Sequence, residues 1–255
     1  MSTSIPQPDR AIAAKEAEWE PIGEPDISDL VTEDETPVDN LLSEKQQRLL
    51  TSALYSSLDR QEPFLAAANV GLFYSANDPP LVPDVLLSFG VPTPEDWTQK
   101  KNRSYFTWNF GKPPDIVIEI VSNTVGNELG RKLQDYARAS VSYYVVYDPF
   151  RYLGKTELRL YELRALQQYR ELDGTAIPEA DLGLTQWEGT FEGSRTTWLR
   201  WCDRDGQILL TGDEKADRER RRADREHQRA EQEHQRAERL ARLLRERGID
   251  PDTLD

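Results

Sequence analysis

The chain has 255 residues, 37% of them hydrophobic, and a formal net charge of −14 at pH 7. This length allows one core domain with appendages. No apolar run approaches the roughly 20 residues of a membrane span, and the first ten residues lack the apolar stretch of a signal peptide. We therefore expect a soluble, cytoplasmic protein outside any membrane. Cys202 is the single cysteine, which excludes an internal disulfide and a cysteine metal cluster.

Charge and composition divide the chain into four parts. Residues 1–40 contain eleven acids and two bases, which predicts a disordered acidic arm. Residues 41–212 are rich in Val, Ile, Tyr and Trp and are expected to form the globular domain. Residues 213–247 contain no proline and many helix formers, so they predict a charged helix. Residues 248–255 form a tail.

The first expected helix covers residues 41–58 (LLSEKQQRLLTSALYSSL). Ser43 can act as its N-terminal cap, and Glu44 then lies in the first turn. The helix dipole stabilises a carboxylate there, so this position explains Glu44 without any catalytic role.

Two buried strands are expected to carry acidic side chains. Residues 81–89 (LVPDVLLSF) contain Asp84, and residues 114–121 (PDIVIEIV) place Asp115 and Glu119 on the face opposite to the isoleucines. An ionised carboxylate in a buried strand is costly unless a cation or hydrogen-bond donors compensate it. A lone acid would more often cap a helix or pair with an arginine, but two such strands favour a shared site.

Residues 128–139 (ELGRKLQDYARA) have the pattern of an amphipathic helix. Leu129, Leu133 and Tyr136 recur at the spacing of a core-facing stripe. Lys132 falls beside that stripe, near the core. Its ordinary interpretation is a lysine whose methylene chain lies along apolar surface while its ammonium reaches water.

Taken together, Asp84, Glu119 and Lys132 have the chemistry of a phosphodiester-cleaving site. Magnesium takes oxygen ligands, usually one or two carboxylates with waters and phosphate oxygens, so the two acids are the expected ligands of Mg²⁺ or Mn²⁺. A nearby ammonium can orient or help to deprotonate the attacking water and offset charge on the pentacovalent phosphate. Lys132 is the candidate for that role.

The order helix, three strands, helix, strand, with VPD in one strand and PPDIVIEIVS in the next, resembles the PD-(D/E)XK nuclease superfamily. Within it, the chain resembles the Uma-type restriction endonuclease family (DUF820-like) over roughly residues 43–212. The residues that carry the resemblance are Pro83, Asp84, Pro114, Asp115, Glu119, Ser122, Lys132, Tyr136 and YYVVYDP at 143–149. It implies an α/β restriction-endonuclease-like core, a magnesium-type ion at the acids, and hydrolysis of nucleic-acid phosphodiester bonds, with DNA as the expected substrate.

The chain departs from the superfamily pattern at the lysine. The position two residues after the second acid is Val121, so the resemblance assigns the lysine's role to Lys132 on the following helix. An acid from the first helix often completes such sites, and Glu44 is the candidate by position. Asp115 is the alternative second ligand, although its place after two prolines is more typical of a turn or a cap.

Two further segments allow more than one interpretation. Residues 97–112 combine Lys100, Lys101 and Arg103 with aromatic residues. They predict either a loop that grips phosphates and stacks bases, or a hairpin whose aromatics pack beneath the sheet. Residues 156–210 alternate short strands with turns, which predicts a β extension of the main sheet.

The C-terminal helix contains a heptad repeat, REHQRAE at 225–231 followed by QEHQRAE at 232–238. Its seam is rich in alanine and gains leucines only near the end. A weak coiled coil that forms a homodimer and a solvated charged helix are both open interpretations. His227 and His234 share a face, but zinc chelation on one helix prefers a spacing of three or four.

The leading hypothesis is a divalent-metal-dependent endonuclease. The expected domain contains no histidine, which excludes a Ser-His-Asp triad, a Cys-His pair and an HNH-type nuclease. The acidic net charge is unfavourable for phosphate binding and favours the alternative, a catalytically inactive nuclease-fold adaptor that acts through protein–protein contacts. A metal-dependent phosphatase or nucleotide hydrolase would use the same ligands on small molecules.

Overall fold

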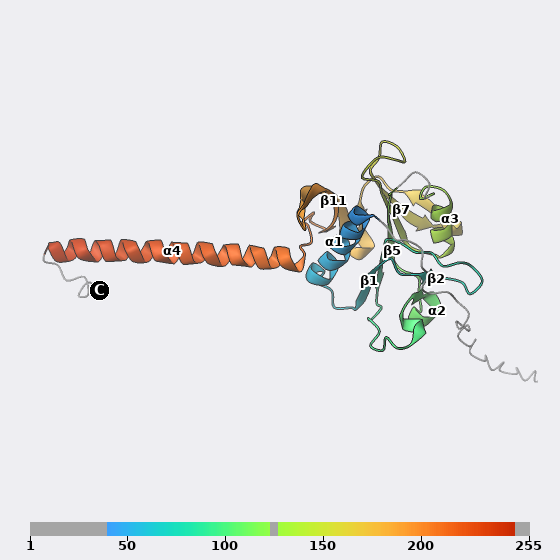
Figure 1. Ribbon diagram of the computed structural model, residues 1–255, viewed down its shortest axis with the longest axis horizontal. Helices are drawn as coiled ribbons and strands as arrows, with labels where there is room; N and C mark the ends of the chain where they lie inside the picture. Colours follow the sequence, from blue (N-terminus) through green and yellow to red (C-terminus); the bar gives the residue numbers. More distant parts are fainter. Residues whose placement is uncertain (1–39, 123–126, 248–255) are drawn as a thin grey trace, which may run out of the picture.

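The computed structural model describes residues 40–122 and 127–247. These residues form a mixed α/β domain and a long helix that projects away from it (Figure 1). The expected tail at 248–255 and the expected acidic arm at 1–40, apart from Asn40, lie outside the described residues. In the described segments, no helix has the length and apolar character needed to cross a bilayer.

Four α-helices and eleven strands follow one another along the described residues. The helices are α1 (Leu41–Ser57), α2 (Thr107–Phe110), α3 (Arg131–Arg138) and α4 (Gly212–Glu246). The strands are β1 (Phe64–Ala68), β2 (Leu72–Phe73), β3 (Val85–Phe89), β4 (Tyr105–Phe106), β5 (Ile116–Ile120), β6 (Tyr143–Tyr147), β7 (Leu158–Arg164), β8 (Gln168–Glu171), β9 (Ala176–Ile177), β10 (Leu182–Phe191) and β11 (Ser194–Asp203). The expected core order of helix, three strands, helix, strand is confirmed by α1, β1, β3, β5, α3 and β6.

A six-stranded sheet with the order β1-β3-β5-β6-β7-β8 forms the centre of the domain. Strands β5 and β6 are parallel, and the other neighbours in this sheet are antiparallel. A parallel pair requires a crossover connection, which α3 supplies. The expected alternation along β5 is confirmed, because Ile116 and Ile118 enter one hydrophobic cluster and Val117 enters the other.

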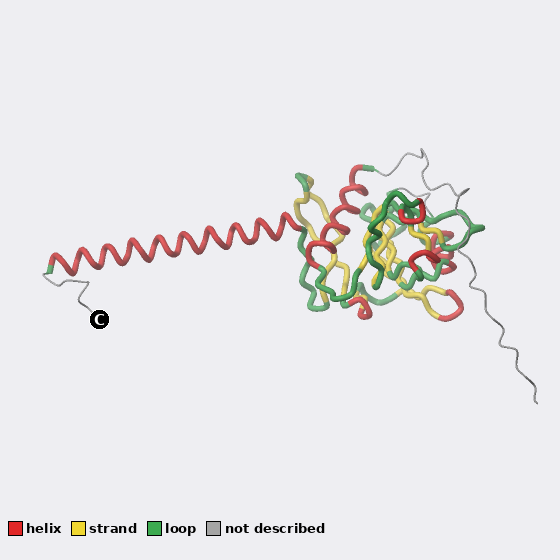
Figure 2. Tube along the Cα trace, turned by 90° about the horizontal axis from the view of Figure 1, so that it is seen from below, coloured by secondary structure: helices red, strands yellow, loops and turns green. Residues whose placement is uncertain are grey.

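Two hydrophobic clusters cover the two faces of this sheet. Helix α1 and the small sheet β11-β10-β9 pack on one face, where Leu54, Leu199 and Trp201 belong to the same cluster. Helix α3 and the short pair β2 and β4 pack on the other face, through Tyr136 and Tyr105. Figure 2 shows the same domain from below, with α4 again extending outward.

The β-rich extension differs in part from the expectation. Strands β7 and β8 extend the main sheet as expected, but β9, β10 and β11 form a sheet of their own. Only the first part of β10 is buried, and the rest alternates between partly and fully exposed positions. The open end of the β10–β11 hairpin therefore packs in the hydrophobic cluster, and its turn lies outside the cluster.

The segment 97–112 does not form a hairpin. It contains a short 3-10 helix, strand β4 and helix α2, and β4 pairs in parallel with β2. Tyr105 and Phe106 are buried in the core, so the base-stacking interpretation is wrong for both. Trp97 is the aromatic residue of this segment that stays largely exposed.

Two helix starts also differ from the expectation. Asn40, not Ser43, caps α1, because its Oδ1 accepts hydrogen bonds of 3.0 Å from the backbone amides of Leu42 and Ser43. Helix α3 begins at Arg131, because the backbone of Gly130 is not helical (φ −118°, ψ −103°). Leu129 therefore lies outside the helix and is 37% exposed, not part of the core stripe.

Gln46 of α1 joins the helix to the outer edge of the small sheet. Its Nε2 donates to the carbonyl oxygen of Leu199 at 2.8 Å, and its Oε1 accepts from the Leu199 amide at 2.9 Å. The side-chain amide thus pairs with β11 as a neighbouring strand would. This contact satisfies two buried backbone groups that β10 does not reach.

Replacing Gln46 by leucine leaves both backbone groups of Leu199 without partners, and each unsatisfied buried group costs about 1–3 kcal/mol. We expect chemical denaturation to show a free energy of unfolding lower by about 2–5 kcal/mol. As the control, Arg48→Gln on the same helix removes a side chain that is 47% exposed and should cost less than about 1 kcal/mol. Equal losses in the two variants would contradict this role for Gln46.

Candidate active site

Asp84 and Glu119 lie opposite each other at the same end of two neighbouring strands. The antiparallel register pairs Val85 with Ile118, so one further step places Asp84 opposite Glu119. Both residues are buried, with 6% and 2% of their surface exposed. Asp84 Oδ2 accepts a hydrogen bond of 2.5 Å from the amide of Ile120, which fixes this carboxylate beside the Glu119 backbone.

Helix α3 brings two donors to Glu119. Lys132 Nζ lies 2.8 Å from Glu119 Oε2, and the Tyr136 hydroxyl donates to Oε1 at 2.5 Å. Residues four apart lie on one face of a helix, so a single face of α3 supplies both groups. The structure therefore brings together Asp84, Glu119 and Lys132, the three residues proposed from the sequence.

Glu128 is a fourth member of the cluster that sequence reasoning missed. It is 5% exposed, and its Oε1 lies 3.5 Å from Lys132 Nζ. Its Oε2 is buried and has no hydrogen-bond partner within the described part of the chain. The sequence feature that could have identified Glu128 is its position four residues before Lys132. At this spacing the side chains of an acid and a lysine meet when the backbone turns as in a helix.

Burial and charge set the protonation of these groups. Burial raises the pKa of Glu119, and the attraction and hydrogen bond of Lys132 oppose that rise only in part. Burial lowers the pKa of Lys132, but the charge and hydrogen bond of Glu119 outweigh burial and leave this pKa raised. Burial, followed by the charge of Glu119, raises the pKa of Tyr136 far above its ordinary value. Lys132 is therefore a cation and Tyr136 a neutral donor at neutral pH.

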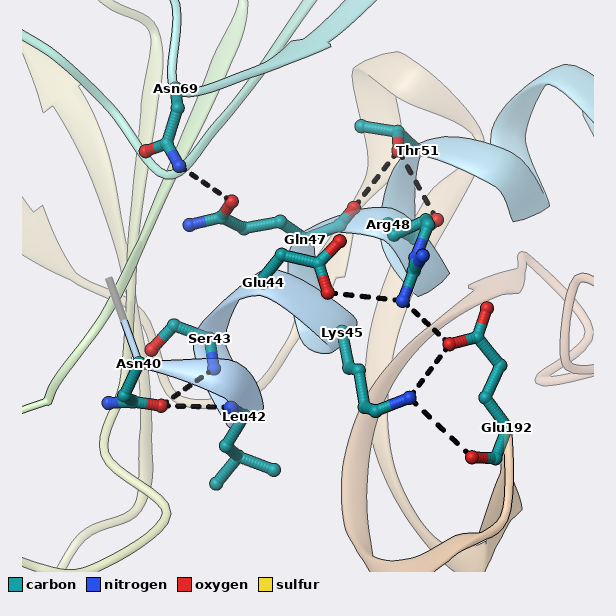
Figure 3. A network of polar contacts seen from close by, with 10 residues as sticks. All are labelled: Asn40, Leu42, Ser43, Glu44, Lys45, Gln47, Arg48, Thr51, Asn69 and Glu192. Atoms are coloured by element: carbon teal, nitrogen blue, oxygen red, sulfur yellow. Dashed lines mark hydrogen bonds and ion pairs between the residues drawn. The ribbon is translucent and has the colours of Figure 1, made fainter. Parts of the chain in front are cut away.

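Helix α1 reaches the cluster through Gln47, not through Glu44. Gln47 Nε2 donates to Asp84 Oδ1 at 2.8 Å. Its Oε1 accepts from Asn69 at 2.9 Å (Figure 3). The Glu44 side chain is 52% exposed and pairs with Arg48 at 3.0 Å. The structure thus places an amide one turn further along α1, where an acid was expected from the resemblance.

Asp115 lies at the other end of β5. Its Oδ2 accepts hydrogen bonds from the Phe89 amide at 2.8 Å and from Lys112 Nζ at 2.6 Å. Four residues of extended strand, about 13 Å, separate it from Glu119. The structure does not bring Asp115 into the cluster, and its contacts join the ends of two strands.

The donor set fits a divalent cation held by two carboxylates. Asp84 and Glu119 supply hard oxygen donors at adjacent positions. With Glu128 and Lys132 they carry three negative formal charges and one positive, a net of −2. Among the described residues, no donor forms a hydrogen bond to the buried Oε2 of Glu128, so the negative charge of the cluster is not fully compensated. Within residues 40–122 and 127–247, no three His, Cys, Asp or Glu side chains form a metal-binding group. Water and phosphate oxygens would have to complete the coordination.

One comparison with known proteins, the match to a family model, identifies the family. A family model described as "Uma2: Putative restriction endonuclease" matches residues 31–192. Among solved structures, the chain is similar to "a putative nuclease belonging to DUF820" from Anabaena variabilis ATCC 29413. That similarity has 16% sequence identity and a TM-score of 0.40, and covers 56% of this chain and 76% of the other. The search of curated proteins found no match.

Lys132→Met removes the cation that opposes the burial of Glu119, so the pKa of Glu119 should rise further. The measurement is a carbon-13 NMR titration of the glutamate carboxyl groups in the variant and in wild type. Lys112→Met is the control, because Lys112 forms an ion pair of similar length, 2.6 Å, with Asp115 instead. A Glu119 pKa that falls or stays constant in Lys132→Met would show that the contact does not govern its charge.

Proposed function

We propose that this chain, which belongs to the Uma2 family described as "Putative restriction endonuclease", hydrolyses phosphodiester bonds of DNA with a divalent cation. Asp84 and Glu119 are the proposed ligands, and Lys132 is the proposed catalytic cation. The observation that carries this proposal is the 2.8 Å contact between Lys132 and the buried Glu119, which lie 13 residues apart on a helix and a strand.

The acids are positioned by neutral donors as well as by charge. The Ile120 amide and the Gln47 side chain each bond one oxygen of Asp84, and Tyr136 bonds one oxygen of Glu119. A carboxylate oxygen has two lone pairs, so it can accept a hydrogen bond and bind a metal ion at the same time. When bound there, Mg²⁺ or Mn²⁺ would polarise a phosphoryl oxygen and lower the pKa of a bound water.

We assign Lys132 the role of a cation. The charge and hydrogen bond of Glu119 outweigh burial and raise the pKa of Lys132, so it contacts Glu119 as an ammonium. An ammonium at this place can orient the attacking water and offset the charge that develops on the phosphate. Its side chain is 35% exposed, whereas Asp84, Glu119 and Glu128 are buried, so a phosphate would approach on its side of the cluster.

The position of Lys132 supports its assignment in place of the missing lysine. Val121, which stands where the superfamily has its lysine, is 1% exposed and packs in the hydrophobic cluster with Val117. Lys132 reaches the same carboxylate from α3 instead. Helix α3, from which Lys132 and Tyr136 both reach Glu119, can supply the ammonium that the strand does not.

The adaptor alternative gives the cluster no role. Buried carboxylates that lack full compensation lower stability. A protein that used only its surface would retain that cost without the chemistry it permits. The cluster therefore favours the enzyme over the adaptor.

With Mg²⁺ or Mn²⁺, wild-type protein should nick or linearise supercoiled plasmid DNA. Glu119→Gln and Lys132→Met should each lower the rate about 100-fold or more, because each removes a group that acts on the charge of the transition state. Lys112→Met changes the same residue type outside the cluster and should retain nearly the wild-type rate. Gel electrophoresis over time gives the rates.

The substrate class is tested in the same series with single-stranded DNA, RNA and a small phosphomonoester. Preference for RNA or for the small ester would contradict the assignment of DNA. Metal-dependent activity that survives in Glu119→Gln would place the chemistry elsewhere. No cleavage of any substrate would support the adaptor.

A further inference from the structure

Helix α4 is an exposed rod attached firmly to the domain at one end. Its 35 residues span about 52 Å at 1.5 Å per residue, and none of them is buried. Thr211 and Glu214 form a capping box at its start, and Arg200, 1% exposed, holds Glu214 with bonds of 2.7 and 2.9 Å. Lys215 donates to the Ser56 carbonyl oxygen at 2.8 Å. The direction of the helix is therefore set by the domain, as both views show (Figures 1 and 2).

One face of α4 carries a continuous row of arginines. At 100° per residue, seven arginines fall within an arc about 100° wide. This arginine stripe consists of Arg218, Arg221, Arg222, Arg225, Arg229, Arg236 and Arg239. Between its two ends the same arc contains one further residue, Gln232, and no acid. The acids of this part of α4 all lie on the remaining surface.

The stripe is poorly neutralised by the helix itself. Of its members, Arg222 alone forms an ion pair between described residues, with Glu226 at 3.1 Å. Three of its pairs stand four residues apart, a spacing at which like charges destabilise an isolated helix. The stripe therefore presents a positive face on which an external anion can bind.

We propose that the arginine stripe binds the phosphate backbone of duplex DNA and so holds the substrate whose cleavage is proposed above. Guanidinium groups match phosphate oxygens with two parallel hydrogen bonds, and they stay charged at every physiological pH. The stripe is about 32 Å long, close to one turn of duplex DNA. It concentrates positive charge on an otherwise acidic chain, which fixes where a polyanion can approach.

The first arginines of the stripe continue onto the domain surface. Arg218, Arg221 and Arg225 line a groove of about 900 Å³ between α4 and strand β10, where Trp187 and Thr190 form part of the opposite wall. Three acids also line this groove, Glu214, Asp217 and Asp224; Glu214 is paired with Arg200 and Asp217 with Arg220. A phosphate backbone that follows the stripe thus reaches the body of the domain.

The stripe is distinct from the coiled-coil seam considered from the sequence. Ala223, Ala230 and Ala237 recur every seven residues on a face about 130° away from the centre of the stripe. Pairing of two helices along that seam would leave the arginines facing outward. A coiled coil formed through the heptad repeat would therefore not cover the arginine stripe.

The test is binding of a labelled duplex of about 20 base pairs, two helical turns, by fluorescence anisotropy in EDTA. The stripe variant is Arg225→Gln/Arg229→Gln/Arg236→Gln. The matched control is Arg220→Gln/Arg242→Gln/Arg245→Gln, which removes the same charge from the opposite face of the same helix. Glutamine is a good helix former, so circular dichroism should show equal helix content.

The stripe variant should bind at least tenfold more weakly, and the slope of log affinity against log salt should fall by about 2.7 for three lost phosphate contacts. The control should keep the wild-type slope. Equal weakening of both variants, or of neither, would overturn the proposal. So would a stripe variant that changes self-association in sedimentation but not DNA affinity.

Binding without metal also separates this proposal from the nuclease. A protein that cleaves nothing but binds DNA through the stripe would disprove the proposed function alone. A protein that cleaves DNA while the stripe variant binds normally would disprove the stripe alone.

Discussion

The ion pair between Glu119 and Lys132 is the interaction on which the candidate site depends. Burial disfavours the charge on Glu119, and the ammonium 2.8 Å away is its compensation. The same contact raises the pKa of Lys132 and keeps it cationic. It also joins strand β5 to helix α3, the crossover that makes β5 and β6 parallel. This one contact therefore links the packing of α3 to the protonation of the site.

Much of this arrangement could be predicted from local sequence patterns. The alternation in PDIVIEIV assigned the faces of β5, and helical spacing placed Lys132 beside Tyr136 and near the core. The order of elements gave the sheet and its flanking helices. These features depend on periods of two and 3.6 residues, which short segments determine by themselves.

The remaining features depend on contacts between distant segments. The register that sets Asp84 opposite Glu119 is a property of two strands together. Gln47 could have been recognised as a polar residue on the same buried face of α1 as Leu50 and Leu54, but its partner Asp84 is 37 residues away. The attachment of α1 to the separate β9 to β11 sheet likewise involves Gln46 and a strand edge 153 residues distant.

The most direct test of the account is Mn²⁺ binding followed by electron paramagnetic resonance, with and without duplex DNA, in wild type, Asp84→Asn and Asp115→Asn. Asp84 and Asp115 are both strand-end acids, but only Asp84 lies at the cluster with Glu119. If Asp84 and Glu119 hold the ion, Asp84→Asn should lose the bound ion and Asp115→Asn should keep it. Binding that survives in Asp84→Asn and is lost in Asp115→Asn would contradict the site proposed here.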